Sequence, residues 1–199
     1  MDRKYLGVDS ILAKAADLVR REKEAAGNVE PAEGYKRRQI EKLKQFATRF
    51  NLWINFDTFF LSYLSKGGEN EVFTGEEDIV FKLNNFEYAG DDLLHFFIRI
   101  AAHNHFFSNV SYNMIGFAYN SQHEFCAVLT QPYVRAKREA TEKEIETYMK
   151  ALGFEMNFTD EFYNEDYVIF DAVPNNVLYG IDDKLYFIDT QIRTRTKEK

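Results

Sequence analysis

Hydrophobic residues recur at helical spacing in four parts of the chain. This periodicity predicts helices over residues 10–26, 35–50, 91–103 and 141–152. The last of these opens with Thr141 and Glu144 at the spacing of a capping box and is followed by Gly153, so both of its ends are marked. An aromatic stretch over residues 57–64 predicts one more short helix, which stops before Gly67-Gly68.

Elsewhere hydrophobic and polar residues follow the period of a strand. The pattern predicts strands over residues 71–73, 78–83, 114–119, 125–130, 167–170, 176–179 and 185–188. Residues 74–77 join the first two as the turn of a hairpin, and residues 180–184 join the last two. The order of elements therefore predicts an α+β domain behind a helical arm.

The composition agrees with a globular chain and excludes several other classes. The 199 residues are 45% hydrophobic and include 19 Phe and 12 Tyr, enough apolar surface for a substantial core. A single cysteine, Cys126, excludes a disulfide framework and indicates a reducing compartment. No apolar stretch approaches the roughly 18 residues of a membrane helix, and the first residues do not resemble a signal peptide. We therefore expect a cytoplasmic protein with no membrane partner.

The net charge of −7 hides an uneven distribution. Residues 1–50 carry 12 basic and 8 acidic side chains, whereas residues 51–192 carry 9 and 23. Because each contact with a nucleic-acid phosphate needs a Lys or Arg, the acidic core argues against nucleic-acid binding by that region.

Three polar residues near the C-terminal end have the order that phosphoryl transfer requires. Asp171 follows a predicted strand, Asn176 comes five positions later, and Asp189 follows the second arm of a hairpin. One carboxylate can receive the proton of an acceptor hydroxyl, while a second carboxylate and an amide oxygen can hold Mg²⁺. Upstream, Gly67-Gly68 and Lys82 lie where they can offer backbone amides and a positive charge to nucleotide phosphates.

In this arrangement the chain resembles the protein kinase-like fold. In detail it is similar to the small kinase domain of bacterial polyvalent proteins, which phages and conjugative elements carry. The similarity extends over about residues 53–193, and the segments that carry it are 67–73, 80–82, 103–104, 131–133, 153–154, 171–176 and 187–189. It implies a minimal kinase-like domain over residues 51–199, behind a helical arm over residues 1–50. That domain would have a small antiparallel sheet with one helix, a hinge near Gln131 and a reduced C-terminal lobe.

The resemblance also implies roles for the matching residues toward ATP. Gly67 and Gly68 would begin the loop that covers the phosphates, and Val72 would pack on the adenine. Lys82 would pair with the α and β phosphates. The backbone from Gln131 to Tyr133 would hydrogen-bond the adenine as the hinge.

Toward Mg²⁺ and the acceptor, the resemblance implies that Asp171 is the catalytic residue and that Asn176 and Asp189 are metal ligands. The expected function is then an ATP- and Mg²⁺-dependent phosphotransferase of a bacterial mobile element, with an acceptor that the sequence does not name.

The chain also departs from the kinase pattern. Phe170 precedes Asp171 where many kinases place Arg, and Thr190-Gln191 follow Asp189 in place of Phe-Gly. Residues 91–103 carry no carboxylate in the middle of their helix to pair with Lys82, so Asp92 or Glu87 is the candidate substitute.

Each signal has a plainer interpretation. An Asp with an Asn five positions later is ordinary turn chemistry, a Lys at a strand end is commonly solvated, and Gly67-Gly68 can end a helix. His95, His103 and His105 lack the spacing of a helical zinc site. The alternative function is a catalytically inactive kinase-like module that binds nucleotide, or that binds a protein or a second copy through residues 1–50.

Overall fold

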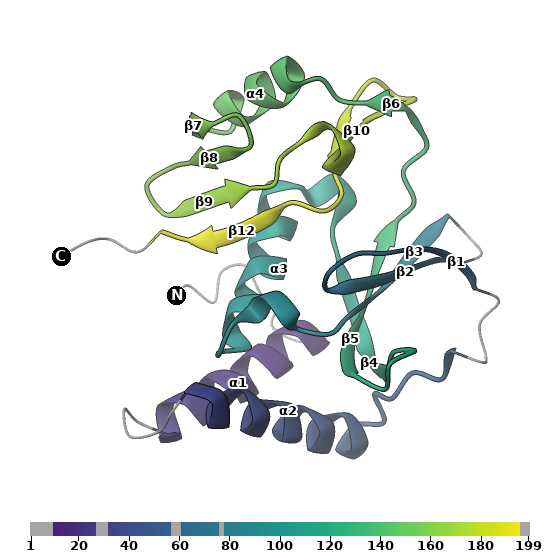
Figure 1. The fold of residues 1–199 in the computed structure, drawn as a ribbon, viewed down its shortest axis with the longest axis vertical. Coiled ribbons are helices and arrows are strands. Elements are labelled where there is room, and N and C mark those ends of the chain that lie inside the picture. Colours follow the sequence, from purple (N-terminus) through teal and green to yellow (C-terminus); the bar gives the residue numbers. More distant parts are fainter. Residues whose placement is uncertain (1–9, 27–31, 57–60, 76–77, 196–199) are drawn as a thin grey trace. The chain divides into compact units, whose positions relative to one another are not determined.

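Figure 1 shows the order of helices and strands along the chain. The computed structural model describes residues 10–26, 32–56, 61–75 and 78–195. It divides into two compact units: unit 1 contains residues 1–98 and 112–133, and unit 2 contains residues 99–111 and 134–199. Among the described residues, no helix has both the length and the apolar character needed to cross a membrane.

Two helices open unit 1, as the periodicity predicts. They are α1 (Ile11–Ala26) and α2 (Ala32–Arg49), and they pack against each other through small and branched apolar side chains that are fully buried, Ala15, Val19, Leu43 and Ala47. These residues recur at helical spacing, so each helix buries one stripe and leaves its charged positions in solvent. The two helices are therefore part of the core of unit 1.

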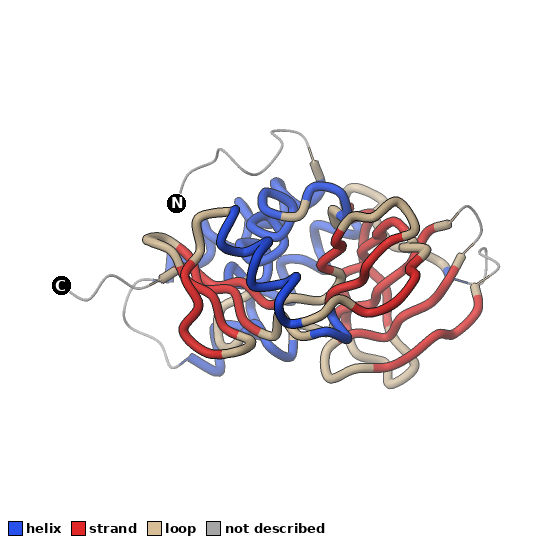
Figure 2. Tube along the Cα trace, turned by 90° about the horizontal axis from the view of Figure 1, so that it is seen from above, coloured by secondary structure: helices blue, strands red, loops and turns tan. Residues whose placement is uncertain are grey.

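Five antiparallel strands form the sheet of unit 1 in the order β1-β2-β3-β5-β4. Their bounds are β1 (Ser62–Lys66), β2 (Asn70–Thr74), β3 (Ile79–Asn84), β4 (Asn113–Tyr119) and β5 (Phe125–Pro132). Figure 2 shows these strands in red with their connecting loops in tan. The predicted hairpin is present as β2 and β3, with Val72 opposite Lys82. One face of the sheet is apolar and buries Phe81, Leu83, Ala118, Cys126 and Val128.

The short helix predicted over residues 57–64 is wrong in its described part. Residues 57–60 lie outside the described residues, and Ser62 to Lys66 form the edge strand β1, paired with β2. All five residues of β1 are exposed, including the apolar Tyr63 and Leu64. Pairing with β2 therefore decides the conformation here, and it overrides the local apolar spacing.

Helix α3 (Leu94–Phe106) begins and ends three residues later than the sequence predicts. Asp92 lies outside it and accepts a hydrogen bond from the Leu94 amide at 3.0 Å, so its carboxylate satisfies one of the open amides of the first turn. His103 is predicted to end the helix but lies inside it and is buried. The first turn of α3 belongs to unit 1, and the helix from Arg99 onward belongs to unit 2.

Helix α4 (Glu142–Ala151) in unit 2 confirms the capping box. The Thr141 side chain accepts from the Glu144 amide, and the Glu144 carboxylate accepts from the Thr141 amide at 2.8 Å. Gly153 follows with a φ of 83°, the left-handed conformation that glycine adopts without strain. Both ends of α4 are thus fixed by residues of the same short segment.

The strands of unit 2 form two small antiparallel sheets. One has the order β12-β9-β8-β7 and the other β11-β10-β6. Their bounds are β6 (Ala136–Glu139), β7 (Glu155–Phe158), β8 (Glu161–Tyr163), β9 (Tyr167–Phe170), β10 (Val177–Gly180), β11 (Leu185–Phe187) and β12 (Gln191–Thr194). The sequence predicts β9, β10 and β11 and misses the other four, which are short or largely exposed.

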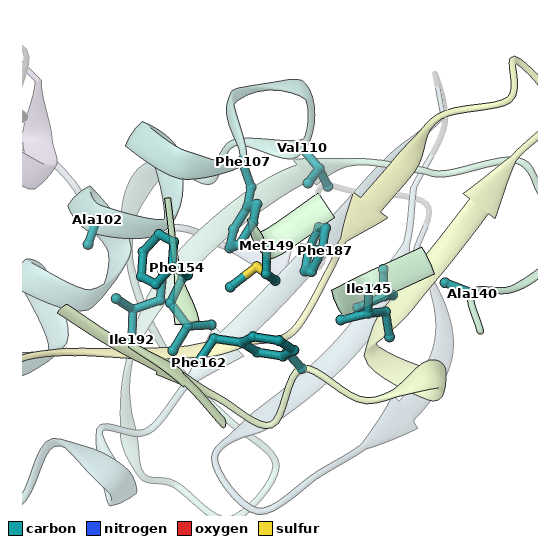
Figure 3. Packing of buried hydrophobic residues seen from close by; sticks show 13 residues of the cluster. Ala102, Phe107, Val110, Ala140, Ile145, Met149, Phe154, Phe162, Phe187 and Ile192 are labelled. Carbon is teal, nitrogen blue, oxygen red and sulfur yellow. The ribbon is translucent and has the colours of Figure 1, made fainter. Parts of the chain in front are cut away.

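The core of unit 2 is aromatic. The Phe107 and Phe187 rings stack with centroids 4.3 Å apart, and Figure 3 shows Met149 beside them. Phe187 is the last residue of β11, so this stack fixes the position of the chain two residues before Asp189.

Candidate active site

Two ladders in unit 2 bring Asp171, Asn176 and Asp189 together. In the first, β9 pairs with β12 and Phe170 lies opposite Gln191, so Asp171 and Asp189 both leave the same end of this ladder. In the second, β10 pairs with β11, and the Ile188 amide donates to the Asn176 carbonyl at 2.9 Å. The segment with Asp171 and Asn176 and the segment with Asp189 each run from one ladder to the other. The register of the two ladders therefore brings these three residues close together.

The backbone of Asp171 adopts a conformation that is uncommon for residues other than glycine. Its φ is 61°, in the left-handed region where Asp and Asn are the best tolerated residues after glycine. The Asn176 side-chain amide donates to the main-chain carbonyl of Asp171 at 3.0 Å and closes the turn between them. Because this bond uses the amide nitrogen, it fixes the direction of the Asn176 side-chain oxygen.

The carboxylate of Asp171 lies in an unfavourable electrostatic environment. Partial desolvation, the neighbouring charge of Asp189 and the more distant Asp160 raise its pKa, and a hydrogen bond from Asn176 offsets part of this rise. A carboxylate next to another carboxylate is stabilised by protonation or by a cation. The geometry is therefore suited to accept a proton or to lie beside a positive ion.

Side chains of α3 hold the segment that carries Asp189. Arg99 donates to the Gln191 side chain at 2.5 Å, and the His103 ring nitrogen Nε2 donates to the Phe187 carbonyl at 2.8 Å. These contacts lie on either side of Asp189 in the chain. Neither contact could be predicted, since the partners of Arg99 and His103 are 92 and 84 positions away and no local pattern links them.

The donors near Asp189 fit Mg²⁺ better than a structural metal. No group of three or more His, Cys, Asp or Glu residues suited to a metal occurs among the described residues. Mg²⁺ needs fewer, because it binds through one or two carboxylates and completes its coordination with water and phosphate oxygens. The hydroxyl of Thr190, next to Asp189, is buried and has no hydrogen-bond partner within the described residues. Oxygen donors of this kind match a hard cation.

In unit 1, three of the predicted nucleotide-binding side chains lie on one face of the sheet. Lys82 on β3 is opposite Val72 on β2 and Leu129 on β5, and Gln131 is opposite Val80. Directly opposite residues share a face, and so do residues two apart. Val72, Lys82 and Gln131 are thus together, on the face opposite the apolar cluster around Phe81.

Lys82 is almost fully buried, with 5% of its surface exposed. Its ammonium donates to the Tyr112 hydroxyl at 3.1 Å. The prediction that Asp92 or Glu87 pairs with this lysine is wrong. Asp92 accepts from Lys23, Gln39 and the Leu94 amide instead, and Glu87 is exposed in the short 3-10 helix Glu87–Ala89.

Gly67 and Gly68 lie in the turn between β1 and β2, which excludes the alternative that they end a helix. The Gly67 amide donates to the Asn70 carbonyl at 2.9 Å within this turn. A Cβ at Gly68 would overlap the hydroxyl of Tyr88, so the absence of a side chain lets the Tyr88 ring approach the loop. A role in covering phosphates stays a prediction.

The predicted hinge begins inside β5. Gln131 is buried within the β3–β5 ladder, and the exposed Tyr133 donates its amide to the Asp78 carbonyl at 2.7 Å. Pro132, between them, has no amide hydrogen. An adenine hydrogen bond from the Tyr133 amide would therefore need this bond to open.

A model of the family described as serine/threonine/tyrosine kinase found in polyvalent proteins matches residues 36–196. This span contains every predicted site residue and most of the chain. The chain belongs to this family. No curated protein and no solved structure matches it.

Membership confirms the resemblance to the kinase domain of polyvalent proteins and the α+β kinase-like fold, and it indicates a kinase-like transferase. The family match begins at residue 36 and so includes most of α2, which the resemblance left outside. The division of the chain at residue 50, and the role of each site residue, stay predictions.

Proposed function

We propose that the protein is an ATP- and Mg²⁺-dependent phosphotransferase that acts on a protein hydroxyl as part of a polyvalent protein of a bacterial mobile element. The observation that carries the proposal is the cluster of Asp171, Asn176 and Asp189 in unit 2. The charge of Asp189 raises the pKa of Asp171, so a proton or a cation between the two carboxylates would be stabilising. The family description, which names serine, threonine and tyrosine, supports the class of acceptor.

Each residue has a chemical role in this proposal. Asp171 takes the proton of the acceptor hydroxyl as its oxygen forms a bond to the γ-phosphorus, while the bond from that phosphorus to the β–γ bridging oxygen breaks and ADP leaves. Asn176 and Asp189 hold Mg²⁺, which when bound neutralises charge on the phosphates. Lys82 contributes a positive charge to the α and β phosphates, and the loop that begins at Gly67 and Gly68 covers them.

Thermal melting with ATP and MgCl₂ tests the nucleotide step. A ligand at one hundred times its dissociation constant stabilises a protein by about 2.7 kcal/mol, which raises the melting temperature of a chain of this size by roughly 5–10 °C. We expect the rise to shrink in Lys82→Met and Asp189→Asn. The exposed Lys143→Met and Asp182→Asn serve as matched controls. A melting curve that millimolar Mg²⁺–ATP does not move would contradict nucleotide binding.

Transfer of radiolabelled phosphate from ATP to the protein itself or to a library of Ser, Thr and Tyr peptides tests the chemical step. We expect transfer by the wild type and loss of it in Asp171→Asn. Nucleotide binding without transfer to any acceptor would instead support the inactive, nucleotide-binding alternative.

A further inference from the structure

The side chain of Tyr112 contacts the buried ammonium of Lys82 in unit 1. The Lys82 ammonium donates to the Tyr112 hydroxyl at 3.1 Å, and its nitrogen lies 5.1 Å from the centroid of the Tyr112 ring. Both residues are buried, with 5% and 7% of their surfaces exposed. A buried ammonium needs such contacts because it has lost its water. The tyrosine supplies two of them, an acceptor oxygen and a ring face.

The path of the chain into β4 explains how Tyr112 reaches this lysine. Ser111 is extended, with φ −61° and ψ 141°, and Tyr112 comes two residues before Met114. Met114 is opposite Leu129, which is opposite Lys82. Because side chains alternate along an extended chain, Tyr112 lies on the same face as Met114 and therefore on the face of Lys82.

A tyrosine partner has a different electrostatic effect from a carboxylate. A glutamate would bring an opposite charge to Lys82, whereas a neutral hydroxyl and a ring face orient the ammonium and add no net charge. The contact with Tyr112 therefore restricts the position of the ammonium and does not itself neutralise its charge.

We propose that Tyr112 is a positioning residue that holds the Lys82 ammonium for the phosphates of the nucleotide. This role rests on the proposed function, since Lys82 is the phosphate contact in that proposal.

Lysine labelling tests the coupling without any need for kinase activity. The wild type and Tyr112→Phe are treated with acetic anhydride at fixed pH, and acetylation of Lys82 is measured by mass spectrometry against the exposed Lys143. A hydrogen bond to a charged group is worth enough to change the protonated fraction about tenfold, so Tyr112→Phe should accelerate Lys82 labelling by about that factor. Tyr119→Phe, a tyrosine of β4 with an exposed ring, should leave the rate unchanged.

Nucleotide affinity tests the role. Tyr112→Phe should raise the dissociation constant for Mg²⁺–ATP by about tenfold. In the Lys82→Met background the same substitution should have no further effect, because it acts through the lysine. A general structural role for the tyrosine predicts instead that the two effects add.

The outcomes separate the inference from the function on which it rests. If Tyr112→Phe leaves Lys82 labelling unchanged while Lys82→Met weakens nucleotide binding, the inference is wrong and the function stands. If labelling changes but neither substitution affects nucleotide binding, both the function and the role of Tyr112 fail.

Discussion

Asp92 and Asp171 both lie outside the helices and strands, but the two units surround them in opposite ways. In unit 1, Asp92 is buried and accepts from Lys23 at 2.7 Å, from Gln39 at 2.9 Å and from the Leu94 amide at 3.0 Å. These hydrogen bonds outweigh its desolvation and lower its pKa. In unit 2, Asp171 is desolvated next to Asp189, and its pKa is raised.

The difference separates a structural carboxylate from a candidate catalytic one. Asp92 connects the first turn of α3 to α1 and α2, and the hydrogen bonds that stabilise its charge all come from residues of the protein. Asp171 and Asp189 repel each other, and a proton or a cation would relieve this repulsion. Groups whose environment opposes their charge are characteristic of functional sites.

The largest expected effect is on catalysis by Asp171→Asn. Phosphate transfer should fall by about 10²- to 10⁴-fold, the usual contribution of a general base, while circular dichroism stays unchanged because Asn tolerates a positive φ. Asp183→Asn is the matched control, since Asp183 also lies in unit 2 with a φ of 63° and is exposed. Equal activity in the two variants would remove Asp171 from the mechanism.

The next largest effect is on the stability provided by Asp92. Asp92→Ala leaves Gln39 and the Leu94 amide without their acceptor and should lower the free energy of unfolding by about 2 kcal/mol in urea titrations. The neighbouring Asp91 is exposed, so Asp91→Ala should change the free energy of unfolding by less than about 0.5 kcal/mol. A loss of the same size in both variants would show that the contacts of Asp92 are not what stabilises α3.

A smaller effect concerns how pH changes the melting temperature of the Asp→Asn variants, which should have opposite signs for Asp171 and Asp92. The pKa of Asp171 is raised by folding, so its ionisation opposes folding above the unfolded pKa of about 3.9. Asp171→Asn should therefore melt above the wild type at pH 7, and the difference should vanish below about pH 4.

Asp92→Asn should behave in the opposite way. Its lowered pKa stabilises the fold above about pH 3.9, and this contribution is lost as pH falls through the folded pKa. Thermal melting from pH 3 to 7 measures both, and a lower melting temperature for Asp171→Asn at pH 7 would contradict the repulsion with Asp189.

The smallest effect tests whether the hydrogen bonds from Arg138 lower the pKa of the Glu144 carboxylate. Glu144 is partly exposed, and the two hydrogen bonds from Arg138, at 2.7 and 2.8 Å, and the capping contacts with Thr141 lower its pKa to about 2. In Arg138→Gln the pKa should rise toward the usual value near 4.3, with little change in melting temperature. NMR titration of the carboxylate measures the shift, and Lys143→Gln is the control. An unchanged pKa would mean that the helix cap dominates.

Local patterns predicted the elements whose stabilising residues are close in sequence. Thr141 and Glu144 are three residues apart, so the start of α4 could be predicted, and the β2–β3 hairpin needed only alternation on both sides of a turn. Strand β1 could not be predicted, because its residues are exposed and its conformation depends on pairing with β2. Strand β6 is likewise exposed along its whole length and follows no apolar alternation.

The candidate site divides in the same way. The order of Asp171, Asn176 and Asp189 is present in the sequence. Together with the upstream segments it was enough to predict the kinase family. The sequence by itself thus determined the residue types, their order and most of the local elements, because these depend on contacts within a few residues. Only the tertiary structure decided that Asp92 accepts hydrogen bonds from Lys23 of α1 and Gln39 of α2. It also decided that Tyr112 contacts Lys82, and that Arg99 and His103 hold the segment of Asp189. Those pairs are 30 to 92 residues apart and depend on strand register and helix packing, which no local pattern encodes.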